Sequence, residues 1–177
     1  MQNIPEALTH PFGPVVGPGS EILILGSFPS VKSREEGFYY GHPRNRFWKI
    51  MSSLAKDKGI SVPDAQLTIP GKKRLILDLG LALWDVCASC VVTGSSDSSI
   101  RSAVPNDIPS LIASAPIRAV MTNGKTADAL YRKLILQKTG ITPVCLPSTS
   151  PANAAWTPEK LTDEWQNAIY RVQLLLK

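Results

Sequence analysis

The chain has 177 residues, a formal net charge of +5 and an isoelectric point near 9.2. This length suits a single domain that buries roughly two-thirds of its unfolded surface. A mean hydropathy of +0.01 and the lack of a long apolar run argue against a membrane-spanning protein. The first residues show no charged segment followed by an apolar core, so we expect an intracellular protein. The positive charge suits a polyanionic partner without establishing one.

The cysteine and histidine content argues against metal chemistry. Three cysteines and two histidines are fewer than an iron–sulfur cluster or a histidine-rich metal site needs, so we expect no metal and no other cofactor. Cys87 and Cys90 have the spacing of a redox pair. They lie in an apolar run rather than at the start of a helix, which favours buried, reduced thiols. A redox enzyme is therefore the less favoured interpretation.

The first half of the chain begins with a segment rich in proline and glycine, residues 1–20, which predicts an extended lead on the surface. The apolar run 22–25 predicts a fully buried strand, and Gly26 and Pro29 predict a turn after it. A helix is expected over about 45–58. The acidic residues of the turn, Glu35 and Glu36, are expected to face solvent.

Three further strands and four further helices are expected along the rest of the chain. The strands are expected at 82–92, 117–122 and 141–146, and the helices at 72–79, 107–115, 125–137 and from Pro158 onward, with a turn or short helix within 63–71. Strands that alternate with helices predict a parallel sheet covered on both faces. We therefore expect one domain over 1–177, a three-layer α/β/α sandwich with a central four-stranded parallel sheet.

Polar loops follow the predicted strands, at the edge where open α/β sheets bind ligands. The first contains the aromatic cluster 38–40 and then His42 and Asn45. The alternative is that the aromatic side chains pack on the core and Asn45 caps the helix. For Asn123 the alternatives are a helix cap and a ligand contact. The serine-rich segment 93–101 is either a solvated loop or part of the same site.

The segment 26–48 resembles the first motif of the uracil-DNA glycosylase superfamily, and it is most similar to the hypoxanthine-DNA glycosylase branch. The matching residues are Gly26-Ser27-Phe28-Pro29-Ser30, Gly37-Phe38-Tyr39-Tyr40 and His42-Pro43-Arg44-Asn45-Arg46-Phe47-Trp48. Segments 123–127 and 146–154 match more weakly. The family's water-positioning asparagine, third in G-I-N-P-G, is Phe28 here. The branch resemblance moves the catalytic role to Asn45, the asparagine of H-P-R-N.

The resemblance implies a DNA repair glycosylase that flips a deaminated base out of DNA and hydrolyses its N-glycosidic bond, without a cofactor and as a monomer. It implies that Asn45 orients the water and that Tyr40 stacks on the base. The implied base-binding residues are Gly26, Ser27, Phe28, Tyr40, His42 and Asn123. The implied DNA-binding residues are Arg44, Ser95, Arg101, Lys125, Ser148, Thr149, Ser150, Pro151 and Asn153, the last five within a loop that would fill the space left by the base.

Hypoxanthine is expected as the main substrate, with uracil second and xanthine also considered. Hypoxanthine and uracil both present a carbonyl beside a ring N–H, and one carboxamide, that of Asn123, satisfies both if its orientation is fixed. Hydrogen bonding thus selects deaminated bases as a class, while the preference for hypoxanthine rests on the branch resemblance. The alternatives are a uracil- or mismatch-specific glycosylase and, because of Phe28, a DNA-binding module without activity. A glycosidase of small nucleosides would not need the loop.

Overall fold

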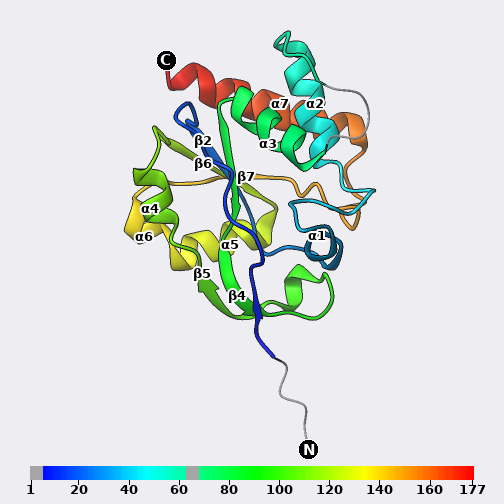
Figure 1. The fold of residues 1–177 in the computed structure, drawn as a ribbon, viewed down its shortest axis with the longest axis vertical. Helices are drawn as coiled ribbons and strands as arrows, with labels where there is room; N and C mark the ends of the chain where they lie inside the picture. The colour runs from blue at the N-terminus through cyan, green and yellow to red at the C-terminus, as the bar shows by residue number, and fades with distance from the viewer. Residues whose placement is uncertain (1–5, 63–67) are drawn as a thin grey trace, which may run out of the picture.

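The computed structural model describes residues 6–62 and 68–177. Its centre is a four-stranded parallel sheet with the strand order β3-β2-β6-β7 (Figure 1). The strands are β2 (Ile22–Gly26), β3 (Leu81–Asp85), β6 (Ala119–Asn123) and β7 (Val144–Leu146). Each lies within or beside a predicted strand, so the predicted four-stranded parallel sheet is confirmed.

Helices cover both faces of this sheet, and successive side chains of β2 show why. Ile22 and Ile24 point into one core, and Leu23 and Leu25 point into the other, because side chains of a strand alternate between faces. The first core is covered by α2 (Phe47–Asp57), α3 (Ile69–Asp78) and α7 (Pro158–Leu175), and the second by α4 (Ile108–Ala113), α5 (Lys125–Leu134) and α6 (Leu136–Thr139). The two groups of helices are separate in Figure 1. The three-layer α/β/α architecture is confirmed.

Local capping explains where the helices begin. Helix α7 starts as predicted, with the Thr157 hydroxyl accepting the Lys160 N–H and a proline in the first turn. Helix α3 starts earlier than predicted, because Thr68 caps it in the same way. The helix predicted over 125–137 is interrupted at Ile135, which separates α5 from α6. Of the segment 63–71, residues 63–67 lie outside the described residues.

A second, antiparallel sheet was not predicted. It contains β1 (Leu8–Thr9), β4 (Cys87–Val91) and β5 (Arg101–Pro105) in the order β1-β4-β5. The single strand predicted over 82–92 is therefore two strands, β3 and β4, which change partners at Val86. The Val86 N–H still bonds the Gly26 carbonyl of the central sheet, while its own carbonyl accepts from Asn106. The short helices α1 (Val31–Glu36) and η1 (Asp97–Ser99) lie beside this sheet.

Over residues 6–20, the N-terminal lead is extended and mostly exposed or half-buried, but it also pairs with strands of the domain. Val15 exchanges two backbone hydrogen bonds with Leu83 and is 4% exposed. The His10 side chain is also only 4% exposed. The lead is built into the domain because β3 and β4 present edges whose backbone groups need partners. Within the described residues, no helix has the length and apolar character to cross a membrane.

Candidate active site

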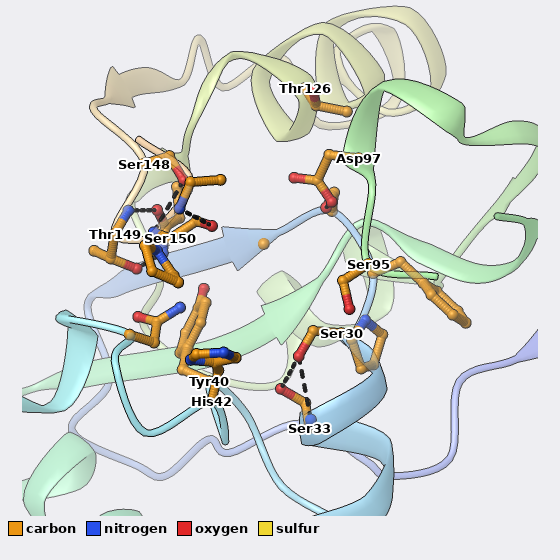
Figure 2. Close-up of a pocket in the computed structure, with 18 of the residues that line it drawn as sticks. Ser30, Ser33, Tyr40, His42, Ser95, Asp97, Thr126, Ser148, Thr149 and Ser150 are labelled. Atoms are coloured by element: carbon orange, nitrogen blue, oxygen red, sulfur yellow. Dashed lines mark hydrogen bonds between the residues drawn. The ribbon is translucent and has the colours of Figure 1, made fainter. Parts of the chain in front are cut away.

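A cavity of about 680 Å³ opens at the carboxyl edge of the central sheet (Figure 2). Parallel strands bring the residues that follow β2, β3, β6 and β7 to one edge, although they are far apart in the sequence. The turn after β2, the aromatic segment before α2, the serine-rich turn around η1 and the loop after β7 complete its walls. A cavity therefore lies at the edge where the sequence predicts a site, while its role as an active site stays a prediction.

Gly26 allows two polar side chains to meet at the floor of the cavity. A Cβ atom at this position would lie 2.3 Å from Asp85 Oδ1 and 3.2 Å from the Tyr40 hydroxyl oxygen. Both groups therefore occupy the space that a side chain at position 26 would need. Phe28, in contrast, is 8% exposed and packs largely in the core, with only part of it lining the cavity.

Asn45 lies just before Arg46, the N-cap residue of α2, and it also lines the cavity. Its Oδ1 accepts the Phe47 N–H at 2.9 Å, and this fixes the amide at the start of α2. The Nδ2 group keeps its hydrogens for a ligand or a water molecule. The nearby His42 accepts the Arg44 N–H at Nδ1, which places the proton of the neutral ring on Nε2. Both side chains line the cavity, while the catalytic role of Asn45 stays a prediction.

The aromatic cluster divides between the core and the cavity. Phe38 and Tyr39 are 3% and 2% exposed, and the Tyr39 hydroxyl donates to the Gly13 carbonyl, so both are mainly core residues. The Tyr40 ring lies 4.1 Å from the Phe47 ring, and its hydroxyl is buried. Tyr40 has φ +53°, a strained value for a bulky residue. Burial raises the pKa of Tyr40, the Asp85 charge adds to the rise, and the nearby Asn123 amide opposes it.

Asn123 is held by the loop after β7. Its Oδ1 accepts the Thr149 N–H and its Nδ2 donates to the Thr149 hydroxyl, each at 2.9 Å. The amide orientation is therefore fixed, as selection of deaminated bases by this residue would require. Thr149 is fully buried, with both polar groups engaged by Asn123, so it supports the wall rather than presenting these groups to DNA. One lone pair and one N–H of Asn123 remain for a base.

Arg46 holds this loop in place, and sequence reasoning missed it. Its guanidinium donates to four carbonyl groups at 2.6–3.3 Å, those of Thr149, Ser150, Asn153 and Trp156. The fixed planar fork of an arginine suits this set of acceptors. The sequence shows only a basic residue at the start of a helix, and this signal does not indicate which loop the side chain reaches.

The candidate DNA-binding residues lie at different distances from the cavity. Ser148, Ser150, Pro151, Asn153 and Ser95 line it, and Ser95 also accepts the Val31 N–H. The basic candidates are exposed and lie outside the lining. These are Arg44, Arg101 and Lys125. The Arg101 guanidinium bonds two carbonyls of its own turn. DNA contacts by all of these residues stay predictions.

Two carboxylates in the cavity were also missed. Asp85 is 3% exposed and bonds His10 Nε2 at 2.8 Å. Asp97 is exposed as a residue, and its carboxylate accepts from the Ser27 hydroxyl at 2.8 Å; partial desolvation by the surrounding cavity wall raises the pKa of this carboxyl against that hydrogen bond. A polar residue that ends a strand was a usable signal for Asp85. No signal in the lead indicated that His10 would reach it. Glu35 and Glu36 face solvent as predicted.

All three cysteines are free thiols, and burial raises the pKa of each. Cys87 and Cys90 are buried and reduced, as predicted, and burial raises the pKa of Cys87 to about 12. A thiol that stays protonated is a poor nucleophile, so the pair does not support redox chemistry. In the described part of the chain, no three His, Cys, Asp or Glu side chains are grouped so that they could hold a metal ion.

The fold and the cavity define an α/β domain with a candidate ligand site at the carboxyl edge of a parallel sheet. The chain belongs to the uracil DNA glycosylase superfamily, whose family model matches residues 14–172. It is 33% identical over 161 residues to a hypoxanthine DNA glycosylase of Methanosarcina acetivorans, covering 90% of this chain and 96% of that protein.

Two further relatives agree with this assignment. A hypoxanthine DNA glycosylase of Methanosarcina barkeri is 34% identical over 143 residues, which covers 80% of this chain and 86% of the relative. The solution NMR structure of a candidate uracil DNA glycosylase from Methanosarcina acetivorans superimposes with a TM-score of 0.74 at 31% identity. That match covers 92% of this chain and 96% of the other.

Proposed function

We propose that this protein is a DNA repair glycosylase that removes deaminated bases, with hypoxanthine as its main substrate and uracil second. The observation that carries this proposal is the cavity, which brings Asn45 and the turn after Gly26 together at the carboxyl edge of the sheet. Sequence identities of 33% and 34% to two hypoxanthine DNA glycosylases, over most of the chain, support hypoxanthine as the preferred base. The cavity volume of about 680 Å³ lies within the usual range of small-molecule sites and leaves room for a purine nucleoside.

The reaction needs little proton transfer by the protein. The bond between C1′ and the base nitrogen breaks, its electron pair leaves with the base, and a water oxygen bonds to C1′. Asn45 orients this water through its amide, and backbone N–H groups after Gly26 stabilise the charge on the departing base. The amide does not accept a proton at neutral pH, so the water loses its proton to solvent or to the base. Positioning therefore supplies most of the rate.

The loop after β7 fills the space in the duplex that the flipped base leaves. Ser148, Ser150, Pro151 and Asn153 form the outer wall of the cavity next to Asn123. Asn153 Nδ2 donates to the Ser148 carbonyl, and this bond closes the loop on itself. A loop held in this way is stiff enough to be inserted without a large entropy cost. We place the protein inside the cell, as a monomer acting on DNA.

The test is single-turnover release of free base from oligonucleotides that carry hypoxanthine, uracil or xanthine. We expect hypoxanthine to be released fastest. Release of uracil but not of hypoxanthine would assign the protein to the uracil- or mismatch-specific class. Binding of all three substrates without release of any base would show a DNA-binding module of the same fold.

A further inference from the structure

The floor of the cavity contains a carboxylate oxygen that the protein leaves free. Asp85 ends β3, its side chain is 5% exposed, and it lines the cavity. Its Oδ2 is bonded to His10 Nε2, but no side chain or backbone group among residues 6–62 and 68–177 donates to Oδ1. Oδ1 lies beside Gly26 and is open to the cavity, where a ligand can supply the donor.

His10 fixes the direction in which this free oxygen points. The Phe12 N–H donates to His10 Nδ1, so the neutral ring carries its proton on Nε2 and donates it to Asp85 Oδ2. The ring is packed edge-on against Phe12 at 4.7 Å and has little room to rotate. Oδ1 is therefore presented to the cavity as a pure acceptor.

A donor without an acceptor lies beside it. The Tyr40 hydroxyl is buried and makes no hydrogen bond of good geometry within the described part of the chain, although the Asn123 amide lies close enough to oppose the rise in its pKa. It lies on the same side of Gly26 as Asp85 Oδ1, as the contacts of a Cβ at that position show. Because burial and the Asp85 charge raise the pKa of Tyr40, the phenol keeps its proton and acts as a donor.

We propose that Asp85 and Tyr40 together read the edge of the flipped base. Asp85 Oδ1 accepts the ring N–H, and the Tyr40 hydroxyl donates to the neighbouring carbonyl. Hypoxanthine, uracil and xanthine all carry this N–H and carbonyl side by side. Adenine presents a ring nitrogen lone pair and an amino group instead, so its lone pair would face the carboxylate. This inference rests on the proposed function, and it assigns base reading to Asp85 and Tyr40 in addition to Asn123, whose amide orientation Thr149 fixes.

The first test reverses one group of the pair without changing its shape. In Asp85→Asn, the His10 N–H retains the amide oxygen in the place of Oδ2, so the amino group replaces Oδ1 and a donor replaces the acceptor. We expect about a 100-fold loss in single-turnover release of hypoxanthine, since a site built for one hydrogen-bond pattern rejects another strongly.

Binding separates base reading from catalysis. Single-stranded oligonucleotides with one 2′-fluorinated deoxyinosine or deoxyadenosine resist hydrolysis and need no base pair to open. Wild-type protein should bind the inosine oligonucleotide more tightly, and Asp85→Asn should lower this ratio at least tenfold. An unchanged ratio overturns the inference. If the wild-type protein binds with the expected ratio but releases no base, the proposed function is overturned while the inference about base reading stands.

The second test removes only the phenol oxygen. Tyr40→Phe keeps the ring contact with Phe47, and we expect a 10- to 100-fold slower release of both hypoxanthine and uracil. Tyr131→Phe is the matched control, because this buried hydroxyl bonds Thr139 and the Ile141 carbonyl in the other core. Wild-type rates in Tyr40→Phe would overturn the pairing.

His10 acts through Asp85, as a positioning residue. His10→Gln keeps an N–H that can reach Oδ2, whereas His10→Phe removes it. The inosine-to-adenosine binding ratio should be largely retained in the first variant and lost in the second. Equal ratios in the two variants would show that His10 contributes only packing, and would overturn its positioning role.

Discussion

Among single residues, Asn45 combines a structural role at the start of α2 with a proposed catalytic role. Its oxygen accepts the Phe47 N–H at the start of α2, and its amino group remains for the cavity. The structural role of Asn45 at the start of α2 and its proposed catalytic role are therefore compatible. The same hydrogen bond orients the amide, so the amino group is held in a fixed position from which it can bind the proposed water.

Substitutions of Asn45 separate its effect on base release from its effect on stability. Asn45→Ala should lower single-turnover release of hypoxanthine about 100-fold or more, as expected for loss of one well-placed polar group. Loss of the hydrogen bond from the Phe47 N–H should also lower the free energy of unfolding by about 1 kcal/mol. Duplex binding should survive.

Asn45→Ser is the matched control, because the serine hydroxyl can accept the Phe47 N–H but cannot supply the amide's amino group. Urea denaturation should show that serine restores stability, while base release stays low. A serine variant with wild-type release would reduce Asn45 to its structural role and move the catalytic role elsewhere.

At the scale of elements, the loop after β7 depends on α2. The Arg46 guanidinium and the Arg46 backbone N–H both donate to carbonyl groups of this loop. One residue at the start of a helix thereby fixes the wall that Thr149 and Asn123 share. The helix cap, the loop and the end of β6 form one connected support for the cavity.

Arg46→Lys should loosen this support. A lysine keeps the charge but lacks the planar fork, so it satisfies fewer of the four carbonyls. We expect base release from duplex DNA to fall at least tenfold, with a smaller loss on single strands, because only the duplex has a gap to fill. Amide hydrogen exchange should become faster over 149–156. Equal losses on both substrates would argue against insertion of the loop.

At the scale of the whole molecule, charge should govern affinity for DNA. The net charge is +5, and the exposed Arg44 lies two residues beyond His42 of the cavity wall. If Arg44 contacts a phosphate, Arg44→Gln should reduce the magnitude of the slope of log affinity against log salt by about 0.9, equally for all sequences.

Arg118 provides the control for this measurement. It precedes β6, at the edge of the sheet opposite the cavity, where it pairs with Glu21 at 2.8 Å. Arg118→Gln should leave the salt dependence of DNA binding unchanged. The same change in slope for both variants would indicate a diffuse effect of net charge rather than a phosphate contact by Arg44.

Much of the fold was predictable because its signals are local. The apolar run 22–25 becomes a fully buried strand, and Thr157 and Pro158 mark the start of α7. The division of 82–92 into β3 and β4 was not predictable, since both strands are apolar and only their partners differ. The pairing of the lead with Leu83 was not predictable for the same reason, because it depends on the free edge of β3, a strand far along the chain.

Local sequence features were enough to predict the four strands of the central sheet, the main helices around it, the sheet edge where the cavity opens, and the motif that contains Asn45. These features follow from hydrophobic period, turn residues and neighbours in the chain, all of which act over short distances. The identity of the polar groups that meet at that edge depends on contacts between distant parts of the chain. His10 and Asp85 are 75 positions apart, and Arg46 reaches carbonyls more than 100 positions away. Such pairs form because folding removes these groups from water, and each buried donor and acceptor then has to find a partner wherever the fold brings one.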